Sequence, residues 1–190
     1  HCFRRVARGP GTIVTSATPA LEQQARTLAA GLYPHQVAGI TFLLGRRRAI
    51  LADDMGLGKT RQSVVAMMKA APTGPWLVVC PASVKHNWER EIRLVEKRVP
   101  VVVVGKTPTP GVSYEGWVII NYDLLKRELG ALLNLNFTGV VFDEAHFLKN
   151  HRAQRSQLAR QLAETPQAPV IHVLTGTPLT NRPRDLFALL

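Results

Sequence analysis

The chain has 190 residues, 46% of them hydrophobic, which is enough for one ordinary domain with its own core. Its formal net charge of +11 favours a polyanionic partner for a folded domain, although a well-solubilised surface would carry the same charge. Only two cysteines are present, so neither a disulfide framework nor a cysteine-based metal site is expected, and a reducing compartment is the simplest assumption. No apolar run approaches the roughly 20 residues that cross a bilayer, so no membrane contact is expected.

Residues 1–30 are predicted to be a basic, flexible lead-in, because they are rich in Arg, Gly, Pro, Ser and Thr and have no apolar signal core. From residue 31 onward, short runs rich in Val and Ile alternate with amphipathic stretches. The runs predict strands at 49–52, 76–80, 101–104, 117–120, 139–142 and 171–174. The stretches between them predict helices at 35–44, 59–70, 84–97, 122–133 and 152–164, with another beginning near Arg182.

The predicted strands are apolar throughout, which is typical of a parallel sheet buried on both faces. The recurring strand–helix order therefore predicts an α/β layered domain over residues 31–190, with a mainly parallel sheet flanked by helices. Such sheets bind their ligands at the carboxyl ends of the strands. The segments that follow the apolar runs are therefore the ones to search for chemistry.

The segment "LADDMGLGKT", residues 51–60, follows the first predicted strand and opens a helix, which is the context that a phosphate-binding loop requires. Gly56 and Gly58 allow the backbone to curl, so that successive N–H groups point inward around an anion. The helix beginning near Lys59 adds the positive end of its dipole.

Two side chains of this segment fit a nucleotide with its metal. Lys59 can reach the terminal phosphates, and the Thr60 hydroxyl can ligate Mg²⁺. The first glycine of the usual pattern is replaced by Asp53, which, like Asp54, can point away from the phosphates while residues 55–60 supply the donors. A nucleotide site is predicted, and the alternative is a Gly-rich turn that only caps a helix.

A second segment, "VVFDEAHFLKN" (140–150), places two carboxylates directly after a predicted strand. Asp143 can hold Mg²⁺ directly or through water, and Glu144 is placed to orient and deprotonate the attacking water. Phosphoryl transfer needs both parts, because its catalysis is mostly positioning and charge neutralisation. An exposed acidic turn is the alternative.

A third segment, "LTGTPLTN" (174–181), also follows an apolar run. Its small residues Thr175, Gly176 and Thr177 could sense the γ-phosphate or contact His146. A Thr/Pro turn without such a role is the alternative.

Taken together, these segments resemble the Swi/Snf-type DNA translocases of helicase superfamily two, and the similarity covers residues 31–190 with every motif in order. "LADDMGLGKT" resembles motif I, in which an acidic pair normally precedes Met-Gly, while "DEAH" matches motif II and "LTGTP" matches motif III. Three further stretches resemble the glutamine motif, motif Ia and the next DNA-facing segment: "GLYPHQVAGITFLL", "VVCPASVKHNWEREI" and "VIINYDLL". The DEAH-box RNA helicases, the nearest alternative, usually carry Ser-Ala-Thr where this chain has Thr-Gly-Thr-Pro.

The resemblance implies a three-layer RecA-like P-loop domain that uses ATP and Mg²⁺. It assigns Lys59 and Glu144 to catalysis, places Gln36 at the adenine edge, and gives Thr60 and Asp143 to the metal. The implied ATP contacts are Gln36, Asp54, Met55, Gly56, Leu57, Gly58, Lys59 and Thr60. Within the family, the chain looks most like the HepA-related, annealing-helicase-like branch. Arg61 departs from the family, which usually has an apolar residue there.

The implied partner is double-stranded DNA, contacted through its backbone without reading its sequence. The positions nominated for these contacts are Pro81, Ser83, Lys85, Asn121 and Tyr122. Trp88 is expected in the core rather than stacked on a base, since it shares a helix side with Val84 and Ile92. The stretch "GRRR" (45–48) is either a DNA patch or a solvated loop near the nucleotide base.

The resulting hypothesis is the first lobe of a two-lobe, DNA-dependent ATPase that moves along duplex DNA. The second RecA-like lobe, with its arginine finger, is expected to lie outside this chain, so the isolated lobe is expected to be nearly inactive. Two alternatives are a DNA-binding or scaffold module with a vestigial nucleotide site, and the motor part of a restriction complex. The frequent Arg and Ala favour a bacterial source and hence the cytoplasm; in a eukaryote the compartment would be the nucleus.

Overall fold

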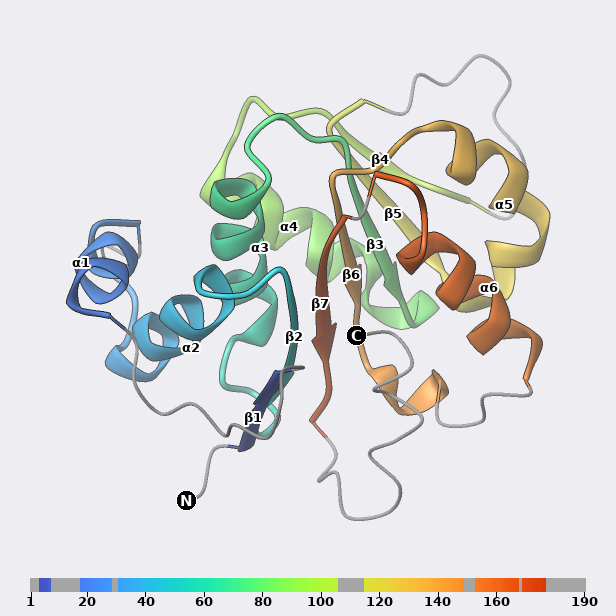
Figure 1. The fold of residues 1–190 in the computed structure, drawn as a ribbon. Coiled ribbons are helices and arrows are strands. Elements are labelled where there is room, and N and C mark those ends of the chain that lie inside the picture. The colour runs from blue at the N-terminus through green and yellow to red at the C-terminus, as the bar shows by residue number, and fades with distance from the viewer. Residues whose placement is uncertain are drawn as a thin grey trace.

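A sheet of seven strands forms the centre of the molecule, with the order β1-β2-β7-β6-β3-β5-β4 (Figure 1). This computed structural model describes residues 4–7, 18–28, 31–105, 115–148, 153–167 and 169–176. The strands are β1 (Arg4–Ala7), β2 (Arg48–Ala52), β3 (Trp76–Cys80), β4 (Val101–Val103), β5 (Trp117–Asn121), β6 (Gly139–Phe142) and β7 (Val170–Leu174). Strands β2 to β7 are parallel to their neighbours, and only β1 pairs antiparallel, with β2.

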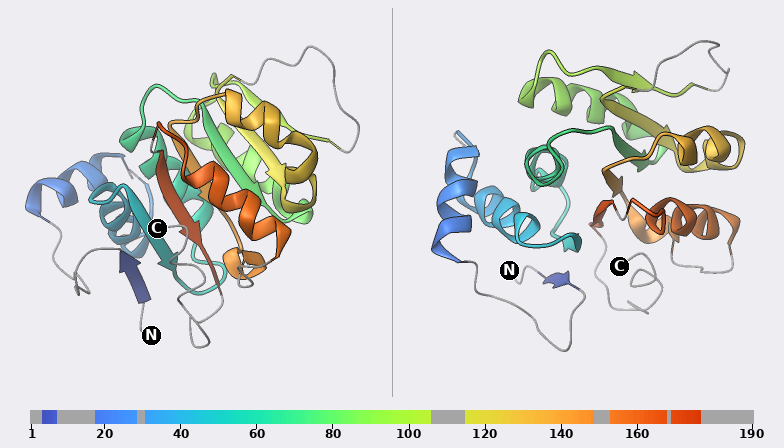
Figure 2. Two further views of the ribbon diagram at one scale, coloured as in Figure 1. Left: turned by 45° about the vertical axis from the view of Figure 1, so that its right-hand side comes forward. Right: turned by 45° about the horizontal axis from the view of Figure 1, so that its top comes forward.

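Helices cover both faces of this sheet, which gives three layers (Figure 2). Their bounds are α1 (Pro19–Leu28), α2 (Pro34–Leu44), α3 (Lys59–Ala70), α4 (Lys85–Val95), α5 (Leu125–Asn134) and α6 (Gln154–Ala163). Short 3₁₀ turns η1 (Ala82–Val84), η2 (Tyr122–Leu124) and η3 (Ala145–Leu148) follow β3, β5 and β6. One core cluster joins helices α1 to α4 to the sheet, and a second joins α5 and α6 to its other face.

The middle of the sheet is apolar on both faces, as the continuous apolar runs predict. In β3, Val78 and Cys80 belong to the cluster under α3 and α4, whereas Leu77 and Val79 belong to the cluster under α5 and α6. All five residues of this strand are buried. The predicted fold class is confirmed, and each of the six predicted strands ends within one residue of its expected bounds.

The start of the chain differs from the expected flexible lead-in, because Arg4–Ala7 pairs with β2 and Pro19–Leu28 forms a helix. Neither element has the long apolar run that marks the central strands. An edge strand is held through backbone hydrogen bonds, so it needs few apolar side chains. Helix α1 packs on α2 and buries Ala25 completely.

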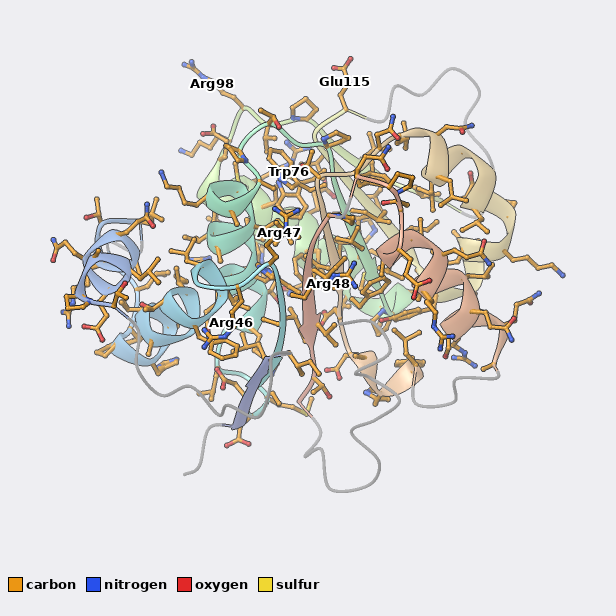
Figure 3. The ribbon with its side chains drawn as sticks, viewed as in Figure 1. Arg46, Arg47, Arg48, Trp76, Arg98 and Glu115 are labelled. Carbon is orange, nitrogen blue, oxygen red and sulfur yellow. The ribbon has the colours of Figure 1, made fainter. Side chains whose placement is uncertain are left out.

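The arginines at 46–48, labelled in Figure 3, lie at the amino end of β2, whereas the phosphate loop follows its carboxyl end. Arg46 donates to the Phe42 carbonyl at 2.9 Å, and Arg48 donates to the Ala163 carbonyl at 2.8 Å. Both side chains thus bind the last carbonyl groups of helices. A loop near the nucleotide base, one of the two expected roles, does not fit this position.

Two other expectations concern a membrane-spanning helix and the end of the chain. Within the described residues, no helix is both long enough and apolar enough to span a bilayer. The helix expected near Arg182 lies outside the described residues.

Candidate functional site

The phosphate loop connects β2 to α3 through two left-handed glycines. Gly56 has a φ of 81° and Gly58 has a φ of 71°, values that only glycine adopts without strain. A Cβ at Gly58 would also lie 2.2 Å from the Gln36 side-chain nitrogen, so this glycine is required for space as well. Helix α3 begins at Lys59, which places its free N–H groups at the loop.

Lys59 lies across this loop. Its ammonium donates to the backbone carbonyls of Asp53, at 2.8 Å, and Asp54, at 2.9 Å. Burial lowers the pKa of Lys59, and four carboxylates oppose that shift: Glu144, Asp143, Asp53 and Asp54. An ammonium has three N–H donors, so one remains for a phosphate oxygen.

The acidic pair before the loop is divided between interior and solvent. Asp53 is 1% exposed, whereas the Asp54 side chain is exposed. The Asp54 side chain thus reaches solvent, whereas the expectation that residues 55–60 supply the donors to a phosphate stays a prediction.

Gln36 lies beside the phosphate loop, near the start of α2. Its side-chain oxygen accepts from the Tyr33 backbone N–H at 3.1 Å, and its nitrogen faces Gly58. The side chain is 8% exposed. A contact with adenine stays a prediction, but the residue is placed next to the nucleotide site.

Gln62 is a supporting residue that the sequence analysis missed. This fully buried side chain donates from Nε2 to the Leu57 carbonyl of the phosphate loop at 2.9 Å. Its oxygen lies over Gly39 of α2, where an added Cβ would approach it to 1.7 Å. Helix α2 and the phosphate loop are therefore linked through Gln62, and Gly39 provides the space.

Asp143 directly follows β6 and is held by two donors. Its Oδ1 accepts from the Glu144 backbone N–H at 2.8 Å, and its Oδ2 accepts from the Trp88 indole N–H at 2.7 Å. Burial raises the pKa of Asp143 above its ordinary value, and these two hydrogen bonds oppose that effect. The carboxylate is therefore fixed in orientation beside the phosphate loop.

Glu144 has a backbone conformation that is rare for a residue with a side chain. Its φ is 48°, and left-handed residues other than glycine are concentrated at functional sites. Its Oε2 lies 3.1 Å from His146 Nδ1, and its side chain is 25% exposed. The carboxylate can therefore both reach water and be oriented by the histidine.

The segment after β7 contacts the phosphate loop. The Thr175 backbone N–H donates to the Leu51 carbonyl at 3.2 Å. A Cβ on Gly176 would lie 2.6 Å from Met55 Cγ and 3.7 Å from Lys59 Nζ, so only glycine fits there without a shift. The expected coupling role of Thr175 and Gly176 is consistent with this contact, and Thr177 lies outside the described residues.

The residues present fit a magnesium ion that is shared with a nucleotide. In the described part of the chain, no group of three His, Cys, Asp or Glu side chains could hold a metal by itself. Mg²⁺ is usually bound by one or two protein oxygens together with phosphate oxygens and water. The Thr60 hydroxyl at the start of α3 and the Asp143 carboxylate at the end of β6 are such oxygens.

The positions nominated for DNA contact differ in how exposed their side chains are to solvent. Ser83 is exposed and Pro81 is half-buried. Lys85 donates to the Val104 carbonyl at 2.8 Å and to Asn121 Oδ1 at 3.2 Å, and Asn121 itself is 7% exposed. DNA contacts by Pro81, Ser83, Lys85 and Asn121 stay predictions.

Tyr122 does not fit the DNA contact that the sequence analysis assigned to it. The side chain is 5% exposed, and its hydroxyl donates to the Asp143 carbonyl at 2.7 Å. The residue turns inward at η2 because its ring belongs to the cluster under α5 and α6. Its role is therefore to support the backbone of motif II.

Arg61 has a specific partner despite its departure from the family pattern. Its Nε lies 2.8 Å from Glu91 Oε2, so an ion pair joins α3 to α4. Helix packing around the phosphate loop is therefore compatible with an arginine at this position.

Three segments meet at the carboxyl ends of a mainly parallel sheet: a phosphate loop, a carboxylate pair and the segment after β7. This arrangement defines the RecA-like class of nucleotide-binding domains. The sequence matches the SNF2-related domain over residues 35–190, so the chain belongs to that family and the resemblance drawn from its motifs is confirmed.

Known proteins of this family resemble the chain closely. A Caenorhabditis elegans protein described as a "SWI/SNF-related matrix-associated actin-dependent regulator of chromatin subfamily A-like protein 1 homolog" is 34% identical over 171 residues. The match covers 82% of this chain and 23% of that protein. The human "DNA annealing helicase and endonuclease ZRANB3" is 36% identical over 172 residues, which cover 84% of this chain and 16% of that protein.

A solved structure shows the same fold. The "Sulfolobus solfataricus SWI2/SNF2 ATPase core in complex with dsDNA" superposes with a TM-score of 0.73 at 29% identity, over 85% of this chain and 35% of that chain. This chain therefore spans less than a quarter of the length of the two curated relatives and about a third of the solved core.

Proposed function

We propose that this chain is the ATP-binding lobe of an ATP-dependent motor that moves along double-stranded DNA. The observation that carries the proposal is that Lys59, at the start of α3, and the carboxylates of Asp143 and Glu144, directly after β6, lie at the carboxyl ends of the strands, near enough for both carboxylates to oppose the lowered pKa of Lys59. A phosphate-binding cation and a metal-binding carboxylate in one site are the parts that phosphoryl transfer requires.

In this proposal the residues of the chain have separate tasks. The N–H groups at the start of α3 and the Lys59 ammonium bind and orient the phosphates. Asp143 and Thr60 hold Mg²⁺, which neutralises charge on the phosphate oxygens when it is bound. Glu144 accepts a proton from the attacking water, and His146 orients its carboxylate.

DNA is the proposed partner because the solved relative is an ATPase core bound to dsDNA and this chain carries a net charge of +11. We further propose a second lobe in the complete protein, since two lobes are needed to turn closure around ATP into movement. The named relatives from animals favour a nuclear location, and they offer no support for a bacterial cytoplasm.

Two alternative functions fit the site less well. A scaffold with a vestigial nucleotide site would have no use for both an intact Lys59 and an intact Glu144. The motor part of a restriction complex would share every residue of this lobe and would be recognised by a neighbouring nuclease domain.

The test is ATP hydrolysis by the complete protein with and without duplex DNA. We expect DNA to stimulate turnover, and Lys59→Ala to remove nucleotide binding, because Lys59 is the mobile charge aimed at the terminal phosphates. Calorimetry with ADP and Mg²⁺ measures the binding. Unchanged affinity in the variant would exclude the phosphate-loop assignment, and turnover indifferent to DNA would exclude a DNA motor.

A further inference from the structure

The indole of Trp88 connects the candidate DNA-facing side of the molecule to the candidate metal site. Trp88 is fully buried and lies on α4, the helix that follows Ser83 and begins at Lys85. Its Nε1–H donates to Asp143 Oδ2 at 2.7 Å, and these two residues are 55 positions apart in the sequence. A hydrogen bond to a carboxylate is stronger and more directional than one to a neutral acceptor.

A second segment, which includes the nominated DNA-contact position Asn121, also holds Asp143. Tyr122, directly after β5, donates its hydroxyl to the Asp143 carbonyl at 2.7 Å. The two segments are also tied to each other, because the Lys85 ammonium lies 3.2 Å from Asn121 Oδ1. Both segments nominated for DNA contact therefore lead to residues that donate a hydrogen bond to Asp143. Trp88 donates to the Asp143 carboxylate, and Tyr122 donates to the Asp143 backbone carbonyl.

Most buried indole N–H groups in proteins have an acceptor, and a backbone carbonyl is enough to satisfy one, although the buried Trp117 Nε1 has no hydrogen-bond partner among the described residues. Trp76 shows this ordinary solution in the same chain, because its Nε1–H donates to the Ala71 carbonyl at 2.7 Å. Trp76, labelled in Figure 3, is the first residue of β3 and lies at the amino ends of the parallel strands, whereas Asp143 follows the carboxyl end of β6. Trp88 differs in that its acceptor is the carboxylate expected to bind the metal.

We propose that Trp88 is a positioning residue that fixes the carboxylate of Asp143 for Mg²⁺ and transmits DNA binding at residues 81–85 to the metal site. This inference rests on the proposed function. Its physical basis is the rigidity of the link: the indole is packed in the core, its N–H fixes the rotation of the carboxylate, and the second oxygen is held by the Glu144 backbone. A small shift of α4 on binding DNA phosphates therefore moves or tightens the metal ligand.

The first test measures how much Mg²⁺ the protein needs to bind ADP. Trp88→Phe keeps an aromatic ring and removes the N–H, so we expect the Mg²⁺ concentration for half-maximal ADP binding to rise by about 10-fold, the scale for losing a partner of a metal ligand. Binding of ADP without Mg²⁺ should stay unchanged. Calorimetric titrations of the complete protein at several Mg²⁺ concentrations provide both values.

Trp76→Phe is the matched control, because it removes an equally short hydrogen bond of a buried indole far from the site. It should leave the Mg²⁺ requirement unchanged. An equal shift in both variants, or no shift in Trp88→Phe, would overturn the proposal. If the unmodified protein binds no ADP, or binds it without regard to Mg²⁺, the proposed function itself fails and this inference fails with it.

The second test needs no change at Trp88. The chain has three tryptophans, Trp76, Trp88 and Trp117, so protein labelled with ¹⁵N-tryptophan gives three indole N–H signals from this lobe. Trp76→Phe and Trp117→Phe identify the Trp88 signal by elimination. We expect addition of a short DNA duplex to shift the Trp88 signal and to leave the Trp76 signal in place. A Trp88 signal that does not respond to bound duplex would overturn the proposed link between DNA and the metal site.

Discussion

At the scale of single residues, Glu144 combines a strained backbone with a carboxylate that water can reach. The left-handed φ of 48° costs energy that surrounding contacts must offset. The next residues, Ala145 and Leu148, are buried in the turn η3, so the backbone on this side of Glu144 is fixed by the core. These buried neighbours therefore hold Glu144 in its strained conformation, with its carboxylate at the carboxyl end of β6, where a water could be activated.

This placement predicts the effect of Glu144→Gln in the complete protein. ATP and DNA binding should remain nearly intact, whereas hydrolysis should slow by about 10²-fold or more, the usual scale for losing a positioned base. Steady-state turnover at saturating DNA measures the effect. Glu164→Gln, which changes an exposed carboxylate after α6, is the control and should hydrolyse normally. Normal turnover in Glu144→Gln would give the role of the base to another residue.

The Gln62 link predicts that Gly39 and Gln62 are energetically coupled. Gly39→Ala would place a Cβ at 1.7 Å from the Gln62 oxygen and push Gln62 off the Leu57 carbonyl, so ADP affinity should fall by about 10-fold, the scale of one lost buried hydrogen bond. In a Gln62→Ala background the same change should cost little. Calorimetry on the four proteins gives a coupling energy, expected to be about 1 kcal/mol or more.

Gly130→Ala is the matched control for this cycle. Gly130 lies within α5, and an added Cβ would meet no atom within 4 Å. It should leave ADP affinity unchanged. Additive effects of Gly39→Ala and Gln62→Ala would contradict the link.

The residues that could be predicted from the sequence are those whose place follows from a strand end. Lys59, Asp143 and Glu144 come after apolar runs, and a parallel sheet brings such positions to one edge. The hydrogen bonds of Trp88 to Asp143 and of Gln62 to Leu57 depend on which helix packs against which loop. No spacing of residues in the sequence encodes this packing. The inward turn of Tyr122 was missed for a similar reason, since a residue after a strand end can face either way.

At the scale of elements, α3 and β7 are joined by a buried polar pair. Ser63 Oγ lies 2.9 Å from His172 Nδ1, and His172 is fully buried. Helix α3 begins at Lys59 and β7 leads to Gly176, so this pair joins the two elements that meet again at the phosphate loop. Burial lowers the pKa of His172 to about 3, because a charged ring there would lose its hydration.

This depressed pKa predicts a pH dependence of stability. Between the ordinary pKa of about 6.5 and the folded value of about 3, the unfolded chain binds a proton at this histidine that the folded chain does not. Stability is therefore lost as the pH falls through this window, by at most about 1.4 kcal/mol per pH unit. A His172→Gln variant lacks this loss.

Denaturant unfolding at about pH 7.5 and about pH 5 tests the prediction. The stability of the original protein relative to His172→Gln should drop by up to about 2 kcal/mol between the two conditions. All other titrating groups are shared by the two proteins, so their contributions cancel in the comparison. A constant difference at both pH values would show that the ring is not held neutral by burial.

Elements were predictable wherever their side chains are buried on both faces. The strands β3 and β6 match their predicted bounds because every residue in them is apolar and buried. The sequence did not predict β1 and α1. The edge strand β1 is held by backbone hydrogen bonds to β2, and the outer helix α1 packs on α2 through one face, so neither needs a long apolar run. The turn η2 delays the start of α5 to Leu125, which the continuous amphipathic pattern from residue 122 does not reveal.

At the scale of the whole molecule, the lobe presents its site at one edge of the sheet. The phosphate loop, Asp143, Glu144 and Gly176 all lie at the carboxyl ends of the parallel strands. Phosphoryl transfer spreads negative charge over the γ-phosphate oxygens, and an arginine that completes such a site is worth roughly 10³–10⁵ in rate. In this proposal the arginine comes from the second lobe, as the resemblance to the two-lobe translocases implies; Arg182 and Arg184 lie outside the described residues.

The incompleteness of the site predicts the behaviour of residues 1–190 on their own. We expect this chain to bind ADP with Mg²⁺ weakly and to hydrolyse almost no ATP, even with DNA, because the arginine that would stabilise charge on the γ-phosphate is proposed to belong to the second lobe. Its DNA affinity should be modest, indifferent to sequence and steeply reduced by salt, since phosphate contacts dominate such binding. The measurement compares turnover of this chain with that of a protein extended through the second lobe, at equal DNA and nucleotide. Equal turnover in the two proteins would mean that this lobe is a self-sufficient ATPase and that its movement along DNA cannot depend on closure of two lobes around ATP.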